Sequence, residues 1–311
     1  MSNPPVSVCL TTYNRASMLS GTLDSILSQG MGDFELIVSD DGSTDATEEV
    51  CRDYAAKDNR ISYFRNGSNL RMPGNLNAAI GRANAPLVAN LHDGDVYRPD
   101  LLSKWKIALE NQPDAAFVFN ALEAIDFDGR HIRFHTHEFG PRIEPLSLTR
   151  FMLNQLTSPV WGTVMARRSS YEKSGMFKTQ YGFISDVEMW MRLNVDHPVA
   201  YIAEPLVSVT PRELTHPYAY VDWRLEQITI TIQRDIIALL EARGLIRAAE
   251  ARRHLQKLRE RRWLFLAGSC LKRRRTDLLT EALKLFGNDD SLLLRSVATL
   301  AFPLRLIAGR R

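Results

Sequence analysis

The sequence predicts an α/β protein whose mixed sheet is flanked by helices and followed by a helical C-terminal extension. Short runs rich in β-branched and apolar residues alternate with segments of helical periodicity over the first 122 residues. With 45% hydrophobic and 24% charged side chains, the 311 residues have the composition of a globular chain, long enough for one large domain or two smaller ones. From residue 223 the apolar residues recur at helical spacing almost to the end.

The first part of the chain alternates strands and helices. The predicted strands are short buried runs, at residues 6–10, 34–39, 61–65, 87–91 and 115–122. The predicted helices each have one apolar face and lie at residues 17–27, 45–55, 74–83 and 100–111; the second opens on a Ser/Thr/Asp cluster suited to an N-cap. This alternation implies parallel pairing with right-handed crossovers, so ligands should bind at the carboxyl ends of the strands.

The pattern is looser beyond residue 122. Residues 126–145 indicate a hairpin or a mobile loop, whose three histidines (His131, His135 and His137) we interpret as surface residues. A strand at 162–167, a helix at 185–194 and a β-like stretch at 200–209 follow. We place a boundary at residue 220, which gives an α/β domain, 1–220, and a basic helical region, 221–311.

Charge is distributed unevenly along the chain. The net charge is +3, but residues 241–311 hold 17 Lys and Arg against 7 Asp and Glu, a net +10, whereas residues 1–240 carry −7. The three cysteines form no CxxC pair, which favours reduced thiols over disulfides or a zinc site. The sequence has neither an apolar run of spanning length nor a signal-peptide pattern, so we expect a cytoplasmic protein.

Polar clusters follow three of the predicted strands. Thr11-Thr12-Tyr13-Asn14-Arg15 follows the first strand, Asp40-Asp41-Gly42-Ser43-Thr44-Asp45 the second, and His92-Asp93-Gly94-Asp95 the fourth. Neither a GxGxxG nor a P-loop motif is present, so phosphate must be bound in another way. Asp93 and Asp95 project to the same side if the backbone is extended, and paired carboxylates suit a hard divalent cation that bridges a diphosphate.

The order of these motifs resembles family 2 of the glycosyltransferases, which have the GT-A fold. The resemblance rests on VSVCLTTYNR, FELIVSDDGSTD, the DxD motif, NLRMPGNLNAAI and YRPDLL, and it covers roughly residues 5–210. It implies a nucleotide-sugar donor bound by Thr11, Tyr13, Arg15, Asp41, Arg71, Asn75 and Asp93, and Mn²⁺ or Mg²⁺ bound by Asp95, with Asp93 contacting the metal or the ribose.

Individual residues in these motifs carry specific expectations. Asp41 matches the carboxylate that accepts a hydrogen bond from the base, for which we expect uridine, with thymidine and guanosine as alternatives. Asp45 is interpreted as a helix cap. Gly94 stands where many family members have an acidic residue, which alters contacts with the donor sugar but leaves both acids of the metal site in place.

The resemblance also identifies a catalytic base. In GFISDVEMWMR, Asp186 matches the carboxylate that takes the proton of the acceptor hydroxyl, although Ser185 replaces the usual Glu and a first-turn helix cap is the alternative role. Glu188 is the reserve candidate. Trp161 is expected to line the acceptor pocket. Lower-ranked candidates for a segment that closes over the donor are Arg212 and His216.

The sequence therefore predicts an inverting, metal-dependent glycosyltransferase that moves a sugar, with a UDP-sugar as the expected donor, to a cell-surface glycan or lipid-linked acceptor. The alternative is a catalytically silent domain that binds nucleotide sugar or glycan and acts as a scaffold through its basic tail. A nucleotidyltransferase is disfavoured because its glycine-rich signature is missing.

The basic tail itself has three interpretations. We favour contact with an anionic membrane surface, which would place the protein peripherally on the inner face of the cytoplasmic membrane. A helical bundle that packs on the catalytic domain or on a second copy in a homo-oligomer is the alternative. Nucleic acid is disfavoured because no reader motif accompanies the charge.

Overall fold

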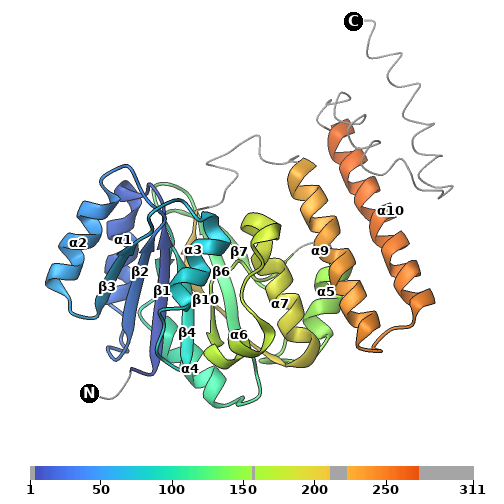
Figure 1. Cartoon of the computed structure of the whole chain (residues 1–311), viewed down its shortest axis with the longest axis horizontal. Helices are drawn as coiled ribbons and strands as arrows, with labels where there is room; N and C mark the ends of the chain where they lie inside the picture. The colour runs from blue at the N-terminus through green and yellow to red at the C-terminus, as the bar shows by residue number, and fades with distance from the viewer. Residues whose placement is uncertain (1–3, 156–157, 211–222, 273–311) are drawn as a thin grey trace, which may run out of the picture. The chain divides into compact units, whose positions relative to one another are not determined.

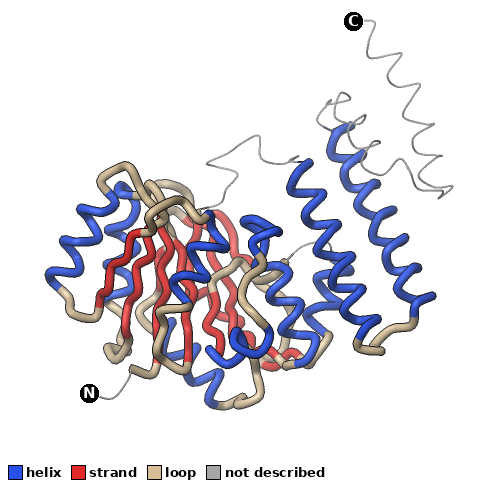
Figure 2. The backbone as a smooth tube through the Cα atoms, in the orientation of Figure 1, coloured by secondary structure: helices blue, strands red, loops and turns tan. Residues whose placement is uncertain are grey.

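The computed structural model describes residues 4–155, 158–210 and 223–272, and its chain divides into two compact units, residues 1–217 and 218–311. The first unit is a layer of strands between helices (Figure 2). Among the described residues no helix is both long and apolar enough to cross a bilayer. Whether the two units are independent domains divided at residue 220 stays a prediction.

The first unit confirms the predicted mixed α/β architecture (Figure 1). Its strands are β1 (Val6–Thr12), β2 (Glu35–Asp40), β3 (Ile61–Arg65), β4 (Leu87–His92), β5 (Val96–Tyr97), β6 (Phe117–Ile125), β7 (His131–His135), β8 (Arg142–Ile143), β9 (Val164–Arg167) and β10 (Val199–Val209). Its helices are α1 (Ala16–Leu27), α2 (Thr47–Lys57), α3 (Arg71–Ile80), α4 (Leu101–Glu110), α5 (Ser147–Gln155), α6 (Arg168–Ser174), the 3₁₀ helix η1 (Thr179–Ile184) and α7 (Ser185–Asp196).

The sheet is mixed because β9, inside it, and the peripheral strands β5, β7 and β8 run antiparallel to their neighbours. The strand order is β3-β2-β1-β4-β9-β6-β10-β5, with β7 on β6 and β8 on β10. β1 to β4 pair in parallel as predicted, and β10 pairs in parallel with β6, but β9 is antiparallel to both β4 and β6. Residues 126–145 form a hairpin through β7 rather than a loop, and α5 and α6 are helices that the sequence pattern did not predict.

The boundaries of α3 differ from the predicted helix at residues 74–83. The helix begins at Arg71, because Pro73 lies in its first turn, where a missing N–H costs no intrahelical hydrogen bond, and it ends before Gly81. Arg71 itself has a positive φ of 62°.

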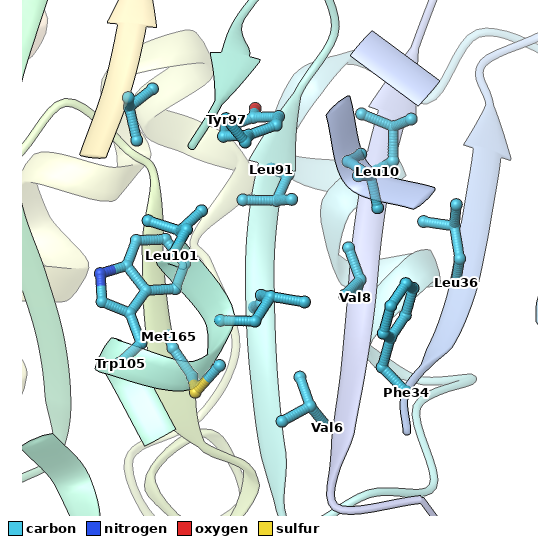
Figure 3. Close-up of a cluster of buried hydrophobic side chains, with 14 of the residues drawn as sticks. Val6, Val8, Leu10, Phe34, Leu36, Leu91, Tyr97, Leu101, Trp105 and Met165 are labelled. Carbon is cyan, nitrogen blue, oxygen red and sulfur yellow. The ribbon is translucent and has the colours of Figure 1, made fainter. Parts of the chain in front are cut away.

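Alternate strand residues divide between two buried faces. Val6, Val8 and Leu10 of β1 lie in one cluster with Leu91 and the α4 side chain of Trp105 (Figure 3). The cluster also includes residues of α1 and α2. On the opposite face Asn90 donates a hydrogen bond to Tyr171 of α6 at 2.8 Å, and Phe117 packs on Trp190 of α7. Both faces of the central strands are therefore covered, whereas β3 and β7 are largely exposed.

The second unit contains α9 (Trp223–Ala242) and α10 (Ala248–Lys272), which pack on each other. The predicted apolar stripe of α9 is present, with Ile232 and Ile236 fully buried. Arg262 of α10, one of the basic residues of the tail, is buried. Its guanidinium is buried and pairs with Glu226 at 2.8 Å, because an uncompensated charge could not be buried between the two helices.

Candidate active site

The ends of β1, β2 and β4 come together at one edge of the sheet. The pairing register places Thr12 opposite Asp40 and Thr11 opposite His92, so the three polar loops begin at the same level. They enclose a cavity of about 450 Å³. Its lining includes all seven residues that the sequence assigns to the donor nucleotide: Thr11, Tyr13, Arg15, Asp41, Arg71, Asn75 and Asp93. Thr12, Asn69 and Met72 complete the lining.

The loop after β1 is fastened to the loop after β2. Asn14 has a positive φ of 53°, a conformation that Asn tolerates, and its side-chain oxygen accepts a hydrogen bond from the Thr44 N–H at 2.8 Å. The backbone N–H of Arg15 donates to the Thr47 hydroxyl at 3.0 Å. Tyr13 keeps 44% of its surface exposed. The backbone is therefore fixed while the Tyr13 ring lies open to a ligand.

The two aspartates after β2 have different surroundings. Asp40 is fully buried and accepts hydrogen bonds from the Ser43 N–H at 2.9 Å and the Tyr63 hydroxyl at 2.7 Å, which makes it part of the turn. Asp41 lines the cavity, and its Oδ1 accepts from the Asn66 amide at 3.1 Å and the Leu70 N–H at 2.8 Å. Both of these bonds use one carboxylate oxygen, so Asp41 joins two loops at the cavity wall.

Asp45 has the contacts of a cap. Its carboxylate accepts from the N–H of Thr47 at 3.0 Å and of Ala16 at 3.2 Å, the first residues of α2 and α1. The Thr47 hydroxyl, which also donates to this carboxylate, is the largest cause of the lowered pKa of Asp45. A charged acceptor at two helix N-termini is favourable, so the contacts agree with the cap interpretation.

Asn75 and Arg71, both on α3, reach the cavity differently. Asn75 is 2% exposed, and its side-chain oxygen accepts from the Ser39 hydroxyl at 2.7 Å and the Asn66 amide at 2.9 Å, while its own amide donates to the Ser39 carbonyl at 2.9 Å. These contacts favour a role in positioning the wall around Asp41. Arg71 is exposed at the cavity rim, where its charge is available to a diphosphate.

The backbone between Asp93 and Asp95 does not meet the condition of being extended, under which the two side chains would project to the same side. β4 ends at His92, and Gly94 turns the chain with a φ of 88°, held by its N–H donating to the Thr22 hydroxyl at 3.0 Å. The two carboxylates nevertheless remain close enough to repel each other. Burial and the charge of Asp93 raise the pKa of Asp95 to about 8, and burial also raises the pKa of Asp93.

Asp93 and Asp95 together have the chemistry of a binding site for a divalent cation. Within the described parts of the chain, no three His, Cys, Asp or Glu side chains gather as metal ligands. Mg²⁺ and similar hard cations commonly bind through one or two carboxylates together with water and substrate phosphates, so two acids suffice. A cation there would relieve the repulsion between Asp93 and Asp95.

A second cavity, of about 520 Å³, contains Asp186. Asp186 lies in the first turn of α7, and burial raises the pKa of its carboxyl to about 7. Trp161, 38% exposed, lines the same cavity, as the sequence predicted for an acceptor pocket. Phe183, Ile184 and Val187 cover the wall on either side of Asp186.

Gly162 links the Asp186 cavity to the end of β4. A Cβ atom on this residue would lie 2.5 Å from Cε1 of His92 and 3.4 Å from Oδ2 of Asp186, so both side chains reach it. Burial lowers the pKa of the His92 imidazole to about 4, which leaves the ring neutral. His92 directly precedes Asp93. The contacts at Gly162 therefore place Asp186 near the carboxylates of Asp93 and Asp95.

The reserve candidate Glu188 is not among the residues that line either cavity at this edge. It is 1% exposed and pairs with Arg192 at 2.9 Å and Lys178 at 2.7 Å, so its described contacts are those of a buried ion pair. Ser185, which replaces the family's Glu, is buried next to Asp186 and adds no charge there. Arg212 and His216 lie outside the described residues.

The three hairpin histidines, interpreted from the sequence as surface residues, differ in their surroundings. His135 and His137 line the Asp186 cavity together with Arg133, whereas His131 is exposed and contacts Glu123. The signal was present in the sequence: residues 133, 135 and 137 have the two-residue period that places strand side chains on one face. What the sequence did not show is which face of the hairpin meets Asp186.

Comparison with known proteins agrees with this arrangement. Residues 7–175 match the model of the family "Glycosyl transferase family 2". The chain is 30% identical over 194 residues to the putative glycosyltransferase EpsE of Bacillus subtilis, covering 61% of this chain and 67% of EpsE. It spans less than half the length of several other glycosyltransferases that it matches.

Two solved structures share the fold. The S. aureus TarS fragment 1–349 in complex with UDP-GlcNAc superposes with a TM-score of 0.65 at 18% identity, covering 90% of this chain and 81% of that one. The mannosyltransferase PcManGT of Pyrobaculum calidifontis, in complex with GDP-Man and Mn²⁺, gives a TM-score of 0.54 at 18% identity, covering 98% and 81%.

Proposed function

The chain belongs to glycosyl transferase family 2, and we propose that it moves a sugar from a nucleoside diphosphate to a hydroxyl of a glycan or lipid-linked acceptor, with inversion. One observation carries this proposal. Gly162 packs against His92, the residue before Asp93 of the donor-type cavity, and lies beside Asp186 of the second cavity, which brings residues of the two cavities close together. Donor and acceptor would thus be held on opposite sides of the reacting carbon, as an in-line displacement requires.

We infer a UDP-sugar as the donor. The nucleotide would lie between the loop after β1 and the loop after β2, with Tyr13 and Arg15 on one side and Asp41 on the other. A carboxylate can accept the imide N–H of uracil, and the related fold of TarS binds UDP-GlcNAc. Arg71 at the rim would contact the diphosphate, for which a guanidinium has matching geometry.

Asp95, together with Asp93, would hold Mn²⁺ or Mg²⁺ against the diphosphate. A bound cation supplies charge stabilisation for the leaving nucleoside diphosphate. The raised pKa values of both carboxyls support this assignment, since burial raises both, the charge of Asp93 also raises that of Asp95, and Arg15 offsets only part of the rise at Asp93. The related fold of PcManGT contains Mn²⁺ with its donor.

Asp186 would accept the proton of the attacking hydroxyl. A general base works best when its pKa is near the working pH, and burial places the pKa of Asp186 at about 7. The acceptor oxygen then attacks the anomeric carbon from the face opposite the leaving diphosphate, through a transition state of oxocarbenium character. The neutral ring of His92 lies beside this path and adds no competing charge.

We further propose that the protein works in the cytoplasm at the inner face of the cytoplasmic membrane, in the synthesis of a cell-envelope polysaccharide. Exposed cations of the second unit support membrane contact, namely Arg247, Arg252, Arg253, Lys257 and Arg261. Each cation close to an anionic surface contributes about 1 kcal/mol. Binding to vesicles with and without anionic lipid tests this part of the proposal.

Thermal stabilisation by nucleotides tests the main proposal. The melting temperature is measured with UDP, dTDP and GDP, each with and without Mn²⁺, because a ligand that binds only the folded state raises its stability. We expect UDP to act in a metal-dependent way and the Asp95→Ala protein to lose the effect. Asp33→Ala, which removes an exposed carboxylate just before β2, is the matched control. Absence of any shift in the unmodified protein refutes the proposal and favours a silent scaffold.

A further inference from the structure

The wall of the Asp186 cavity contains a cluster of basic side chains on one hairpin. Arg133, His135 and His137 alternate along β7 and just beyond it, and all three line the cavity with Trp161. The His135 ring lies 4.6 Å from the Trp161 ring, and the Arg133 Nε donates to His135 Nε2 at 3.0 Å. These contacts join the cation, the imidazole and the indole into one surface.

Arg133 differs from its basic neighbours in its partner. Arg130 pairs with Asp128 at 2.7 Å, and Arg142 pairs with Asp114 at 2.8 Å. Over the described ranges, Arg133 has no carboxylate partner, and its hydrogen bond goes to an imidazole nitrogen that carries no charge when it accepts. No acidic side chain in the described part of the chain therefore neutralises the positive charge of Arg133.

The carboxylate of Asp186 does not neutralise the charge of Arg133. It is the one acidic side chain in the described lining of the cavity, and no ion pair joins it to Arg133. As the proposed base, Asp186 must also bind a proton during the reaction, which an arginine partner would oppose. The cavity contains the guanidinium of Arg133, two histidines and the carboxylate of the proposed base. This lining favours an anionic ligand.

The cluster is held in place by packing. The His137 ring stacks on Phe139 with centroids 5.4 Å apart and meets Phe151 edge-on at 5.7 Å, and its backbone N–H donates to the Tyr201 hydroxyl at 3.1 Å. Aromatic surfaces such as Trp161 suit the apolar face of a sugar ring, while a guanidinium suits carboxylates and phosphates. The cavity thus combines a surface for a sugar with a site for an anion.

We propose that the acceptor carries an anionic group, a phosphate or a carboxylate, which binds Arg133 while an acceptor sugar lies on Trp161 and offers its hydroxyl to Asp186. This inference rests on the proposed glycosyl transfer and defines the acceptor class of the same site. The group could belong to a diphosphate-linked lipid, to a phosphorylated glycan or to a uronic acid, and all three present negatively charged oxygens to the guanidinium.

A panel of acceptors tests the inference. Four probes are compared: farnesyl-diphosphate-linked N-acetylglucosamine, N-acetylglucosamine 6-phosphate, p-nitrophenyl glucuronide and neutral p-nitrophenyl glucoside. Transfer is followed by mass spectrometry and kcat/KM. We expect transfer to at least one anionic probe, and the probe that is used identifies whether the anion belongs to a lipid, a sugar phosphate or a uronic acid. Arg133→Gln should lower its kcat/KM by about tenfold to a hundredfold, mainly through KM.

Matched variants make the result specific. Arg130→Gln removes a cation of the same hairpin that is already paired with Asp128, and it should leave transfer unchanged. Arg133→Lys should restore part of the lost activity, because the charge remains while the guanidinium fork is lost. Equal losses in the Arg133→Gln and Arg130→Gln proteins, or a neutral probe used as well as the anionic ones, overturn the inference.

Donor binding separates this inference from the proposed function. The nucleotide-dependent rise in melting temperature is measured on the same protein samples. Its presence without transfer to any anionic probe refutes the acceptor inference and leaves the donor site standing. Its absence refutes the proposed glycosyl transfer, and the acceptor inference with it.

Discussion

Replacing Asp186 with Asn should have opposite effects on activity and stability. Asn has nearly the same shape as Asp but can neither accept a proton from the acceptor hydroxyl nor carry a charge. Loss of a general base lowers a rate by about 10²-fold to 10⁴-fold. The same change removes a carboxyl whose ionisation is opposed by its burial. The variant should therefore transfer sugar more slowly and melt at a higher temperature.

The stability effect follows from the pKa of Asp186, raised by burial from 3.8 to about 7. Because the folded pKa lies above the unfolded one, the folded state favours the protonated carboxyl, and ionisation costs stability as the pH rises from 3.8 to about 7. At 1.36 kcal/mol per pKa unit, this cost is roughly 2 kcal/mol at about pH 5.5 and roughly 4 kcal/mol at about pH 8. Below the unfolded pKa it vanishes, since both states are then protonated.

Two assays check this prediction. Initial rates of transfer are measured for both proteins, and melting temperatures are recorded by circular dichroism at the two pH values. For a folded unit of roughly 200 residues, 1 kcal/mol corresponds to about 2–4 °C, so the gain at the higher pH should be roughly 10 °C and the gain at the lower pH about half of it. Asp53→Asn, at an exposed position of α2, is the control and should change neither quantity.

The outcomes separate the two parts of the reasoning. An unchanged rate in the Asp186→Asn protein shows that this carboxyl is not the base. A lower melting temperature at the higher pH shows that the charge of Asp186 is compensated within the fold, and the argument from burial fails.

Three further predictions concern the backbone, the metal site and the second unit. Gly162→Ala should lower the rate of transfer at least about tenfold and cost roughly 1–3 kcal/mol of stability. The φ of Gly162 is +85°, and the new methyl group would collide with His92. The control Gly21→Ala, with open space around the new methyl group, should not destabilise the protein. Asp95→Asn should raise the melting temperature of the metal-free protein by an amount that grows as the pH rises from 3.8 to about 8, because burial and Asp93 oppose ionisation of the aspartate, yet it should abolish Mn²⁺-dependent stabilisation by UDP. Arg262→Met should destabilise the α9–α10 pair by about 3–5 kcal/mol, because it leaves the buried carboxylate of Glu226 unpaired. The loss should be seen as faster amide hydrogen exchange in both helices. Replacing Glu226 as well should recover most of the lost stability.

The sequence by itself determined the order of β1 to β4 and α1 to α4 and the edge at which ligands should bind. Both follow from local patterns, because hydrophobic period reports which faces are buried and the carboxyl ends of parallel strands meet at one edge. For that reason Tyr13, Asp41 and Asp93, which follow three different strands, could be predicted to lie together, and they line one cavity. The resemblance to the family added Asp186, with Trp161 as a candidate for the same pocket, and both line another cavity.

Tertiary structure decided which distant surfaces meet. The antiparallel strand β9 follows directly after Gly162 and brings it against His92, a residue 70 positions earlier, while the β6–β7 hairpin brings His135 towards Asp186. No local pattern encodes such contacts, because they depend on how whole elements pack around the shared core. The same reason explains the pairs of Glu188 with Lys178 and of Arg262 with Glu226. Each pair joins different elements, so only packing determined that the partners would be within reach.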